Sequence, residues 1–264
     1  MSYLNDVLLG IIEGITEFLP ISSTGHLLVA EHWLGARSDM YNIVIQAGAI
    51  LAVTLIYWRR LMDLAIGWRE PGNRDYLFKL AVAFLITAVL GLVVKKLGFE
   101  LPSTVTPVAW ALVLGGLWMI VAETFAARLP ASSAIPMRVA VAVGLAQIVA
   151  GIFPGTSRSA ATIFAAMLLG TSNRGAATEF AFLVGIPTMY AASGYELLKE
   201  LKGGGATEDW TGLGIAFVVS TVTAFVAVKW LLGFIRSHRF TAFAIYRILF
   251  GGALLLLAQA GLVA

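Results

Sequence analysis

The sequence predicts an all-α, polytopic integral membrane protein, and three observations lead to that fold class: its composition, its long apolar segments and two pairs of shorter ones. Hydrophobic residues make up 59% of the 264 positions and charged residues only 12%, and the mean hydropathy is +0.88. A soluble domain of this length carries about a quarter charged residues. The short alternating segments that are typical of a membrane β-barrel do not occur. We therefore expect α-helices that span a bilayer.

The chain opens with two short apolar segments, Tyr3–Leu19 and Thr24–Leu34, which are joined by the sequence PISS. A second pair, Val139–Phe153 and Ser159–Leu169, is joined by PGTS. Several of these segments are too short to cross a bilayer, which takes about 20 residues. Irregular backbone is tolerated at membrane depth only where protein surrounds it. We predict two re-entrant helix hairpins, each reversing at its proline.

Six longer apolar segments can each cross the bilayer as one helix, at a rise of about 1.5 Å per residue. Three of them lie between the two hairpins, and three follow the second hairpin. We expect six transmembrane helices at Tyr41–Trp58, Tyr76–Val94, Val105–Phe125, Gly175–Leu198, Thr211–Ile235 and Thr241–Leu262.

The two halves of the chain resemble each other. Aligning Pro20 with Pro154 gives an offset of 134 residues, close to half of the chain. We infer an internal duplication, with repeats at about residues 1–130 and 131–264 of a single membrane domain. Because each half holds three crossings, an odd number, the second repeat must have inverted topology. The polar residues that align are Glu13 with Gln147, Ser23 with Ser157 and, approximately, Gln46 with Glu179.

Loop charges predict the orientation in the membrane. The arginine-rich side of this topology should be cytoplasmic, because short cytoplasmic loops are enriched in basic residues. Both termini then face the periplasm, the first hairpin enters from outside, the second enters from the cytoplasm, and the two tips meet near the midplane. The arginines on the predicted cytoplasmic side are Arg59, Arg60, Arg69, Arg74, Arg128, Arg138, Arg174, Arg236 and Arg239, and the lysines on the other side are Lys95, Lys96, Lys199 and Lys202.

The overall charge indicates which kinds of partner the protein has. The formal net charge is +3 and the pI is about 9.3, which fits basic loops beside anionic membrane lipids. We expect no nucleic-acid binding, because no basic run with interleaved aromatic residues occurs. The chain has no cysteine, which excludes disulfides and thiolate metal sites.

The first hairpin carries a polar cluster, EGITEFLPISSTGH at residues 13–26. Glu13 and Glu17 are four residues apart and share one face of a helix. Two like charges repel each other strongly in a poorly solvated site unless a cation lies between them. The pair therefore suits a divalent metal with oxygen ligands, a general base, or both. The alternative is a structural pair that bonds to other helices.

The hydroxyl groups of this cluster follow a helix stop. Pro20 ends the first helix, and Ser22, Ser23 and Thr24 can cap the next one. A helix start with free backbone N–H groups and hydroxyls is a ready site for phosphate. His26 lies two or three residues inside that helix, where it could shuttle a proton, act as a nucleophile, or make a structural contact.

The tip of the second hairpin reads PGTSRSAAT at residues 154–162. Gly155 lets the backbone approach a ligand closely, Ser157 can cap a helix, and Arg158 offers a planar fork for phosphate oxygens. Arg158 could alternatively form a salt bridge with Glu13 or Glu17, and the two roles can coexist. The substrate-binding residues that we predict are Ser22, Thr24, Gly155, Thr156, Ser157, Ser159, Thr162 and Gln46.

In these two clusters the chain resembles the undecaprenyl-diphosphatase family, the membrane phosphatases of bacitracin resistance. The first cluster matches that family's ExxxE motif with its serine-rich turn and histidine, and the second tip matches its PGxSRSxxT motif. The resemblance spans the whole chain, including IQAGAILAV at Ile45–Val53 and EFAFLVGIP at Glu179–Pro187. No motif position departs from the family pattern.

The resemblance implies that the terminal phosphate is removed from undecaprenyl diphosphate, which yields the monophosphate carrier lipid for peptidoglycan synthesis and gives bacitracin resistance. It further implies a homodimer in the bacterial inner membrane, a site open to the periplasm, and a divalent cation, Mg²⁺ or Ca²⁺. By motif position, Glu13 and Glu17 are the essential carboxylates and metal ligands, and Arg158 is the phosphate clamp. Ser23 is the proposed nucleophile and His26 a catalytic partner, with His26 also the rival nucleophile.

Three other functions compete with this one. Inverted repeats with broken helices also build secondary transporters, so the chain could instead flip undecaprenyl phosphate. A type 2 phosphatidic acid phosphatase has an element similar to SSTGH, but that class needs a histidine after its SR element, and none lies between Arg158 and His238. A purely structural membrane protein leaves Arg158 and both glutamates without a purpose.

Overall fold

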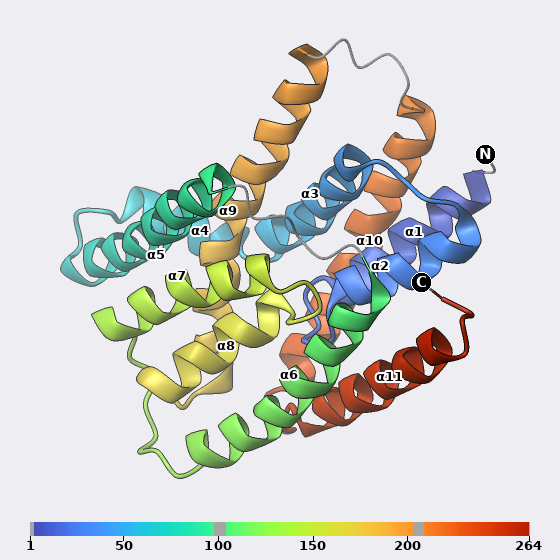
Figure 1. Ribbon diagram of the computed structural model, residues 1–264. Helices are drawn as coiled ribbons and strands as arrows, with labels where there is room; N and C mark the ends of the chain where they lie inside the picture. Colours follow the sequence, from blue (N-terminus) through green and yellow to red (C-terminus); the bar gives the residue numbers. More distant parts are fainter. Residues whose placement is uncertain (1–2, 98–103, 203–208, 264) are drawn as a thin grey trace.

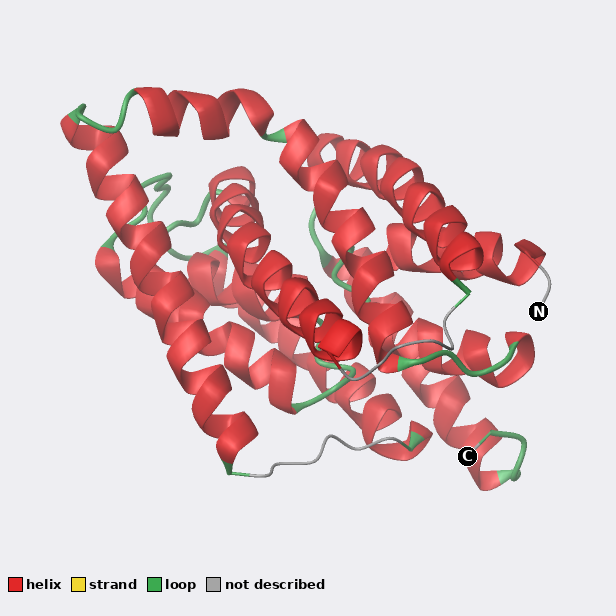
Figure 2. Cartoon of the chain, turned by 90° about the horizontal axis from the view of Figure 1, so that it is seen from above, coloured by secondary structure: helices red, strands yellow, loops and turns green. Residues whose placement is uncertain are grey.

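The computed structural model describes residues 3–97, 104–202 and 209–263, and these form eleven α-helices and no strand (Figures 1 and 2). The chain is all-α, as predicted. The helices are α1 (Tyr3–Thr16), α2 (Ser23–Leu34), α3 (Asp39–Ile56), α4 (Trp58–Ile66), α5 (Pro71–Lys96), α6 (Val105–Ala126), α7 (Met137–Ile152), α8 (Arg158–Leu169), α9 (Arg174–Lys202), α10 (Trp210–Phe234) and α11 (Thr241–Gln259).

Five of these helices are long and apolar enough to cross a membrane: α3, α5, α6, α10 and α11. They coincide with five of the six predicted spans, and the chain is a multi-pass membrane protein. The sixth predicted span lies in α9, which is 29 residues long, contains Pro187 and carries charged residues near both ends, including Arg174 and Lys199.

Four of the short helices form two pairs, α1 with α2 and α7 with α8. Each second helix starts from a serine with a positive φ angle, 73° at Ser22 and 69° at Ser157, and these are the only such non-glycine residues in the described part of the chain. Side chains rarely adopt this backbone region, which here reverses the chain sharply. The two tips touch, because the hydroxyl of Ser159 donates to the carbonyl of Leu19 at 3.1 Å. In Figure 1 the blue and yellow-green pairs accordingly approach each other in the middle of the molecule.

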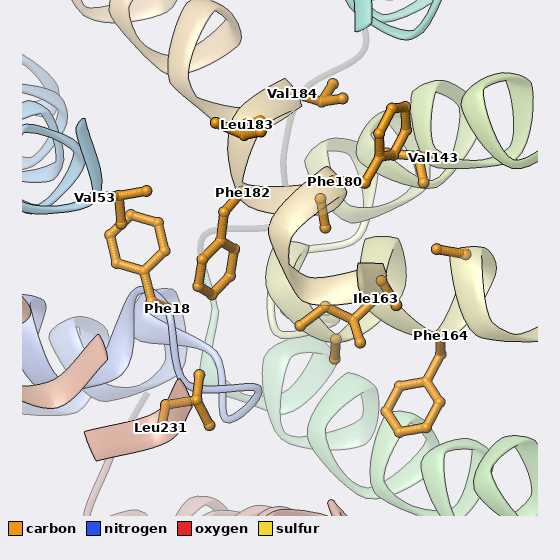
Figure 3. Close-up of a cluster of buried hydrophobic side chains, with 14 of the residues drawn as sticks. Phe18, Val53, Val143, Ile163, Phe164, Phe180, Phe182, Leu183, Val184 and Leu231 are labelled. Atoms are coloured by element: carbon orange, nitrogen blue, oxygen red, sulfur yellow. The ribbon is translucent and has the colours of Figure 1, made fainter. Parts of the chain in front are cut away.

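The boundaries near the first tip differ from the prediction. We expected the first helix to continue to Leu19, but α1 ends at Thr16. Phe18 and Leu19 belong instead to the buried core, so the apolar pattern continues past the end of the helix and does not mark it. The ring of Phe18 packs edge-on against Phe182 of α9, with centroids 5.1 Å apart (Figure 3). This contact anchors the tip of the first hairpin in the centre of the protein.

A short helix was missed by the sequence analysis. Residues 58–66 were expected to end a span and enter a loop, but they form α4, which follows α3 after the single residue Tyr57. One face of α4 is apolar, with Leu61 and Leu64 packed against the core, and Arg59 lies on the exposed side. Arg60, at the edge of the apolar face, binds Glu179 of α9 at 3.3 Å. Nine residues are too few for their periodicity to stand out beside long apolar spans.

The helices α6 and α11 pack closely through glycines (Figure 1). A β-carbon at Gly116 would lie 2.7 Å from the carbonyl oxygen of Ala244, and one at Gly251 would lie 2.7 Å from the carbonyl oxygen of Ala109. Gly116 and Gly251 are 135 positions apart in the chain. Ala109 and Ala244 are separated by the same 135 positions. Adding 135 to the residue numbers of Gly116 and Ala109, both in α6, therefore gives Gly251 and Ala244 of α11. The two contacts are equivalent in the two halves of the chain.

A similar relation links α1 and α10 with α7 and α5. A β-carbon at Gly10 would lie 2.7 Å from the carbonyl oxygen of Ala216 in α10, and one at Gly144 would lie 2.8 Å from that of Ala83 in α5. Small residues that allow backbones to approach are typical of helix packing in membranes. The first helix of each hairpin is thus seated on a long helix by a corresponding glycine.

One ion pair with a buried carboxylate fixes the loop after each hairpin. After α2, Arg37 binds Asp6 of α1 at 2.7 Å, and the side chain of Asp6 is only 2% exposed. After α8, Arg174 binds Glu123 of α6 at 2.8 Å, and Thr241 of α11 donates to the same carboxylate at 3.3 Å. The open ends of the two hairpins are therefore held by different sets of helices.

Candidate active site

The two hairpin tips enclose a small polar cavity of about 40 Å³. Residues from both tips and from α3 and α7 line it, and all of them except Ala150 were picked out from the sequence. They are Glu17, Ser22, Ser23, Thr24, Gln46, Ala150, Gly155, Ser157 and Arg158.

Two helix N-termini meet at this cavity. The cap residues of α2 and α8 are Ser22 and Ser157, which both line the cavity. The first N–H groups of a helix lack partners within the helix, and its N-terminus carries about half a positive charge. The hydroxyl of Ser157 accepts from the amide of Ala160 at 3.3 Å, whereas Ser22 makes no side-chain cap bond. The two helix N-termini therefore contribute positive charge at the cavity, which favours an anion there.

The cap residues of α2 and α8 show which positions of the two tips correspond. Ser22 and Ser157 are the equivalent cap residues, so Ser23 corresponds to Arg158, the first residue of α8. The alignment on prolines placed Ser23 opposite Ser157, one position away. At equivalent starts of their helices, one tip thus presents a hydroxyl and the other a guanidinium.

A serine and a carboxylate are paired inside the cavity. The hydroxyl of Ser23 donates to Oε2 of Glu17 in a short hydrogen bond. Both residues are buried, with 6% and 8% of their surfaces exposed. A carboxylate in this position can accept the hydroxyl proton while the oxygen attacks an electrophile. The pair has the geometry of a nucleophile with its base.

His26 is held away from that pair. Its Nδ1 lies 2.7 Å from the carbonyl oxygen of Ser22, so Nδ1 carries a hydrogen and donates it. Its Nε2 lies 2.7 Å from the hydroxyl of Tyr246, and its ring stacks on Phe250 with centroids 4.4 Å apart. Both ring nitrogens are thus engaged, and neither of them contacts Ser23.

Glu13 lies one turn before Glu17, fully buried behind the cavity wall. Neither of its carboxylate oxygens has a hydrogen-bond partner in the described part of the chain. A buried carboxylate without a partner costs several kcal/mol unless a proton or a cation compensates it. A divalent cation held by Glu13 and Glu17 fits this arrangement.

The protein supplies only part of such a metal site. No cluster of three His, Cys, Asp or Glu side chains suitable for a metal occurs among the described residues. Mg²⁺ typically binds one or two carboxylates and takes its other ligands from water and substrate phosphates. The two glutamates beside an anion-binding cavity match that pattern.

Arg158 lines the cavity with a half-buried side chain. We had considered a salt bridge to Glu13 or Glu17, but within the described residues Arg158 forms no ion pair with either. Its guanidinium is available to an anion in the cavity, where it offers two parallel N–H donors.

Three predicted binding residues have other contacts. The hydroxyl of Thr162 donates to the carbonyls of Arg158 and Ser159 in its own helix, at 2.7 and 3.2 Å. Ser159 bonds to Leu19 at the junction of the tips, and the carbonyl of Thr156 accepts from Arg247. None of these three residues is among those that line the cavity.

Sequence reasoning missed two consecutive residues of α11, Tyr246 and Arg247. Tyr246 reaches the first hairpin through His26, and Arg247 reaches the second through the carbonyls of Gly155 and Thr156. An arginine inside a predicted membrane span was visible in the sequence and is expensive there unless it has a purpose. It lay far from both motifs along the chain, so no spacing rule connected it with them.

Comparisons with known proteins give one family for nearly the whole chain. The family model described as "Bacitracin resistance protein BacA" matches residues 6–253. The chain is 74% identical to an undecaprenyl-diphosphatase of Rhizobium etli (strain CIAT 652) over 265 residues, with 100% of both chains covered. It is 73% identical, over all of both chains, to one from Rhizobium johnstonii, and 64% identical, over 95% of both, to one from Xanthomonas euvesicatoria pv. vesicatoria.

Proposed function

This chain belongs to the family of the bacitracin resistance protein BacA, and we propose that it hydrolyses undecaprenyl diphosphate to undecaprenyl phosphate and inorganic phosphate. The observation that carries the proposal is the cavity between the two tips. It places a serine bonded to a carboxylate beside an arginine and two helix N-termini. Relatives with at least 64% identity bear the name of this activity.

In the reaction that we propose, the terminal phosphate binds between the N-termini of α2 and α8 with its oxygens on Arg158. The hydroxyl oxygen of Ser23 attacks the terminal phosphorus, Glu17 takes the hydroxyl proton, and the bond to the bridging oxygen breaks, releasing undecaprenyl phosphate. Water then cleaves the phosphoserine, giving inorganic phosphate and returning the proton to Ser23. Phosphoryl transfer depends mainly on positioning and on offsetting charge. A divalent cation held by Glu13 and Glu17 would offset further charge on the diphosphate.

His26 is the rival nucleophile. The contacts of its ring favour Ser23, because Nδ1 donates to Ser22 and Nε2 accepts from Tyr246. For His26 to attack phosphorus, Tyr246 would first have to release Nε2. We therefore assign His26 a supporting role, in which it holds the start of α2 against α11.

Phosphate release by purified protein in detergent tests the mechanism. We expect Ser23→Ala and Glu17→Gln each to lower kcat by at least about 100-fold, the range typical of a lost catalytic base or nucleophile. His26→Gln should retain more activity than either. If Ser23→Ala turned over substrate at a rate near that of the parent, the serine mechanism would be wrong.

The same assay separates hydrolysis from lipid flipping. Inverted repeats with broken helices are also typical of transporters, so undecaprenyl phosphate transport is the alternative function. Detergent leaves no compartments, so phosphate released from a prenyl diphosphate there can only come from hydrolysis. Protein that releases no phosphate in detergent, but moves lipid in vesicles, would favour the transporter.

We further propose that α1 with α2 and α7 with α8 are re-entrant hairpins, inside six crossings formed by α3, α5, α6, α9, α10 and α11. Several contacts support this topology. The tips meet through Ser159 and Leu19, while the open ends are anchored separately by Arg37 and by Arg174. Glycine contacts that repeat after 135 positions between α6 and α11 support an inverted repeat of residues 1–130 and 131–264.

For the orientation we propose that the arginine-rich ends face the cytoplasm of the bacterial inner membrane. The first hairpin and both termini then face the periplasm, where the site would open. Hydrolysis there would return the carrier lipid to peptidoglycan synthesis and give bacitracin resistance. A homodimer is part of the same proposal and rests on family resemblance.

A further inference from the structure

Arg247 is a buried charge that the mechanism above does not use. It lies in the apolar helix α11, is 0% exposed, and is the largest of the fully buried side chains. Among the described residues no carboxylate forms an ion pair with it. An arginine buried without a counter-ion is costly, and the cost must be offset by hydrogen bonds to its N–H groups.

Those hydrogen bonds run to backbone carbonyls on two different elements. Nη1 donates to the carbonyl of Thr156 at 2.8 Å and Nη2 to that of Gly155 at 2.9 Å, both in the tip of the second hairpin. On α6, Nη2 also donates to Ala111 at 3.1 Å and Nε to Leu112 at 3.4 Å. The guanidinium of Arg247, which is carried by α11, therefore connects the tip of the second hairpin to α6.

Glycines make room for this arrangement. A β-carbon at Gly115 of α6 would lie 2.2 Å from Nη2 of Arg247, so no other residue at 115 leaves the guanidinium in place. Gly155 has a φ angle of +94°, and a β-carbon there would lie 2.5 Å from the carbonyl oxygen of Val108. The tip is thus pressed against α6 at the point where Arg247 holds it.

The orientation of one peptide plane links Arg247 to the cavity. In a trans peptide the carbonyl of residue 156 and the N–H of Ser157 point in opposite directions. Arg247 fixes the carbonyl of Thr156 on the protein side, which turns the N–H of Ser157 the other way, and Ser157 lines the cavity. Arg158, the next residue and the first of α8, follows this fixed peptide plane directly.

We propose that Arg247 is a positioning residue for phosphoryl transfer: it holds the carbonyls of Gly155 and Thr156 so that the N–H of Ser157, the N-terminus of α8 and the side chain of Arg158 face the transferred phosphate. This inference rests on the proposed function. Its basis is the fork geometry of the guanidinium, since a lysine ammonium carries the same charge but cannot reach carbonyls in several fixed directions.

Arg247→Lys and Arg247→Gln test the proposal in detergent, with unfolding temperature, kcat, KM and hydrogen exchange of residues 153–161 measured for each. We expect both variants to lower kcat by about 100-fold, comparable to the loss of an oxyanion donor, with KM changed less than threefold. Three amides of this segment that are hydrogen-bonded in the parent, those of Thr156, Ala160 and Ala161, should exchange at least tenfold faster. The first tip should exchange as in the parent.

Gly115→Ala provides a second route if Arg247 variants do not fold. It leaves Arg247 in the chain but displaces its guanidinium, so kcat should fall at least tenfold. Gly252→Ala is the matched control, because a β-carbon at Gly252 of α11 would meet nothing within 4 Å. It should behave as the parent does.

Three outcomes would overturn the inference. Arg247→Lys could restore kcat fully, which would mean that charge alone matters. Folded Arg247→Gln could match the parent in kcat while the parent is active. The exchange of residues 153–161 could remain unchanged in the folded variants, which decides against positioning even if the parent releases no phosphate and the proposed function itself fails.

Discussion

At the scale of single residues, Glu13 and Glu17 differ in their hydrogen-bond partners. The carboxylate is fully buried and neither oxygen has a donor in the described part of the chain. A structural pair that bonds to other helices, the alternative considered for Glu13 and Glu17, would show such donors. Glu17 does have one, the hydroxyl of Ser23. The two carboxylates therefore have different surroundings although they share a helix face.

We predict that Glu13→Gln removes stabilisation by divalent cations. A ligand that binds only the folded state raises the free energy of unfolding by about 2.7 kcal/mol at 100 times its Kd. The parent should therefore unfold at a higher temperature in millimolar Mg²⁺ or Ca²⁺ than in chelator, and Glu13→Gln should not. The measurement is thermal unfolding in detergent, which does not depend on turnover.

Two results would contradict this prediction. If the parent and Glu13→Gln gained equal stability from the cation, the metal would bind elsewhere. If neither gained any, a proton would be the compensating charge at Glu13. Asp75→Asn is a suitable control, because Asp75 is an exposed carboxylate that pairs with Lys79 at the surface.

At the scale of helices, the sequence was informative where the chain breaks and less so where helices touch. Pro20 and the Pro154–Gly155 pair predicted the two reversals, because proline and glycine act on their own backbone. The end of α1 and the existence of α4 were missed, because tertiary packing decides them. Phe18 is apolar in the tip as it would be in a helix, and the face of α4 is stabilised by the core.

The same distinction holds within the site. Residues next to the breaks, such as Ser23 and Arg158, could be predicted from the motifs. The hydroxyl of Thr162 bonds to carbonyls within its own helix, a local pattern that competes with a role in binding. The approach of Arg247 depends on how α11 packs, which does not follow from local sequence.

We predict that Gly10→Val destabilises the protein by about 1–3 kcal/mol through overpacking, because its β-carbon would lie 2.7 Å from the backbone of α10. Gly144→Val should destabilise the protein similarly, because a β-carbon there would lie 2.8 Å from the carbonyl oxygen of Ala83 in α5. Gly214→Val is the control, since a β-carbon there would meet nothing within 4 Å. Denaturant or thermal unfolding in detergent measures all three, and equal stability of Gly10→Val and Gly214→Val would argue against this close seating.

At the scale of the whole molecule, the meeting of the two hairpin tips lets one cavity draw on both halves of the chain. The carboxylate and the serine come from the first half, and Arg158 comes from the second. Each hairpin has its own anchor at its open end, through Asp6 or Glu123. The site therefore depends on the ion pairs that hold the open ends of both hairpins.

The orientation is open to a direct measurement, because the chain contains no cysteine and each introduced one is unique. We predict that Lys96→Cys and Lys202→Cys react with a membrane-impermeant maleimide in intact spheroplasts, whereas Arg69→Cys and Arg236→Cys react only after permeabilisation. All four positions are exposed, so a lack of labelling reports sidedness and not burial. The arginines should be cytoplasmic because a positive loop is retained there during insertion. The reverse pattern would place the open end of the first hairpin in the cytoplasm, and a phosphatase acting from the periplasmic side could then not use this cavity.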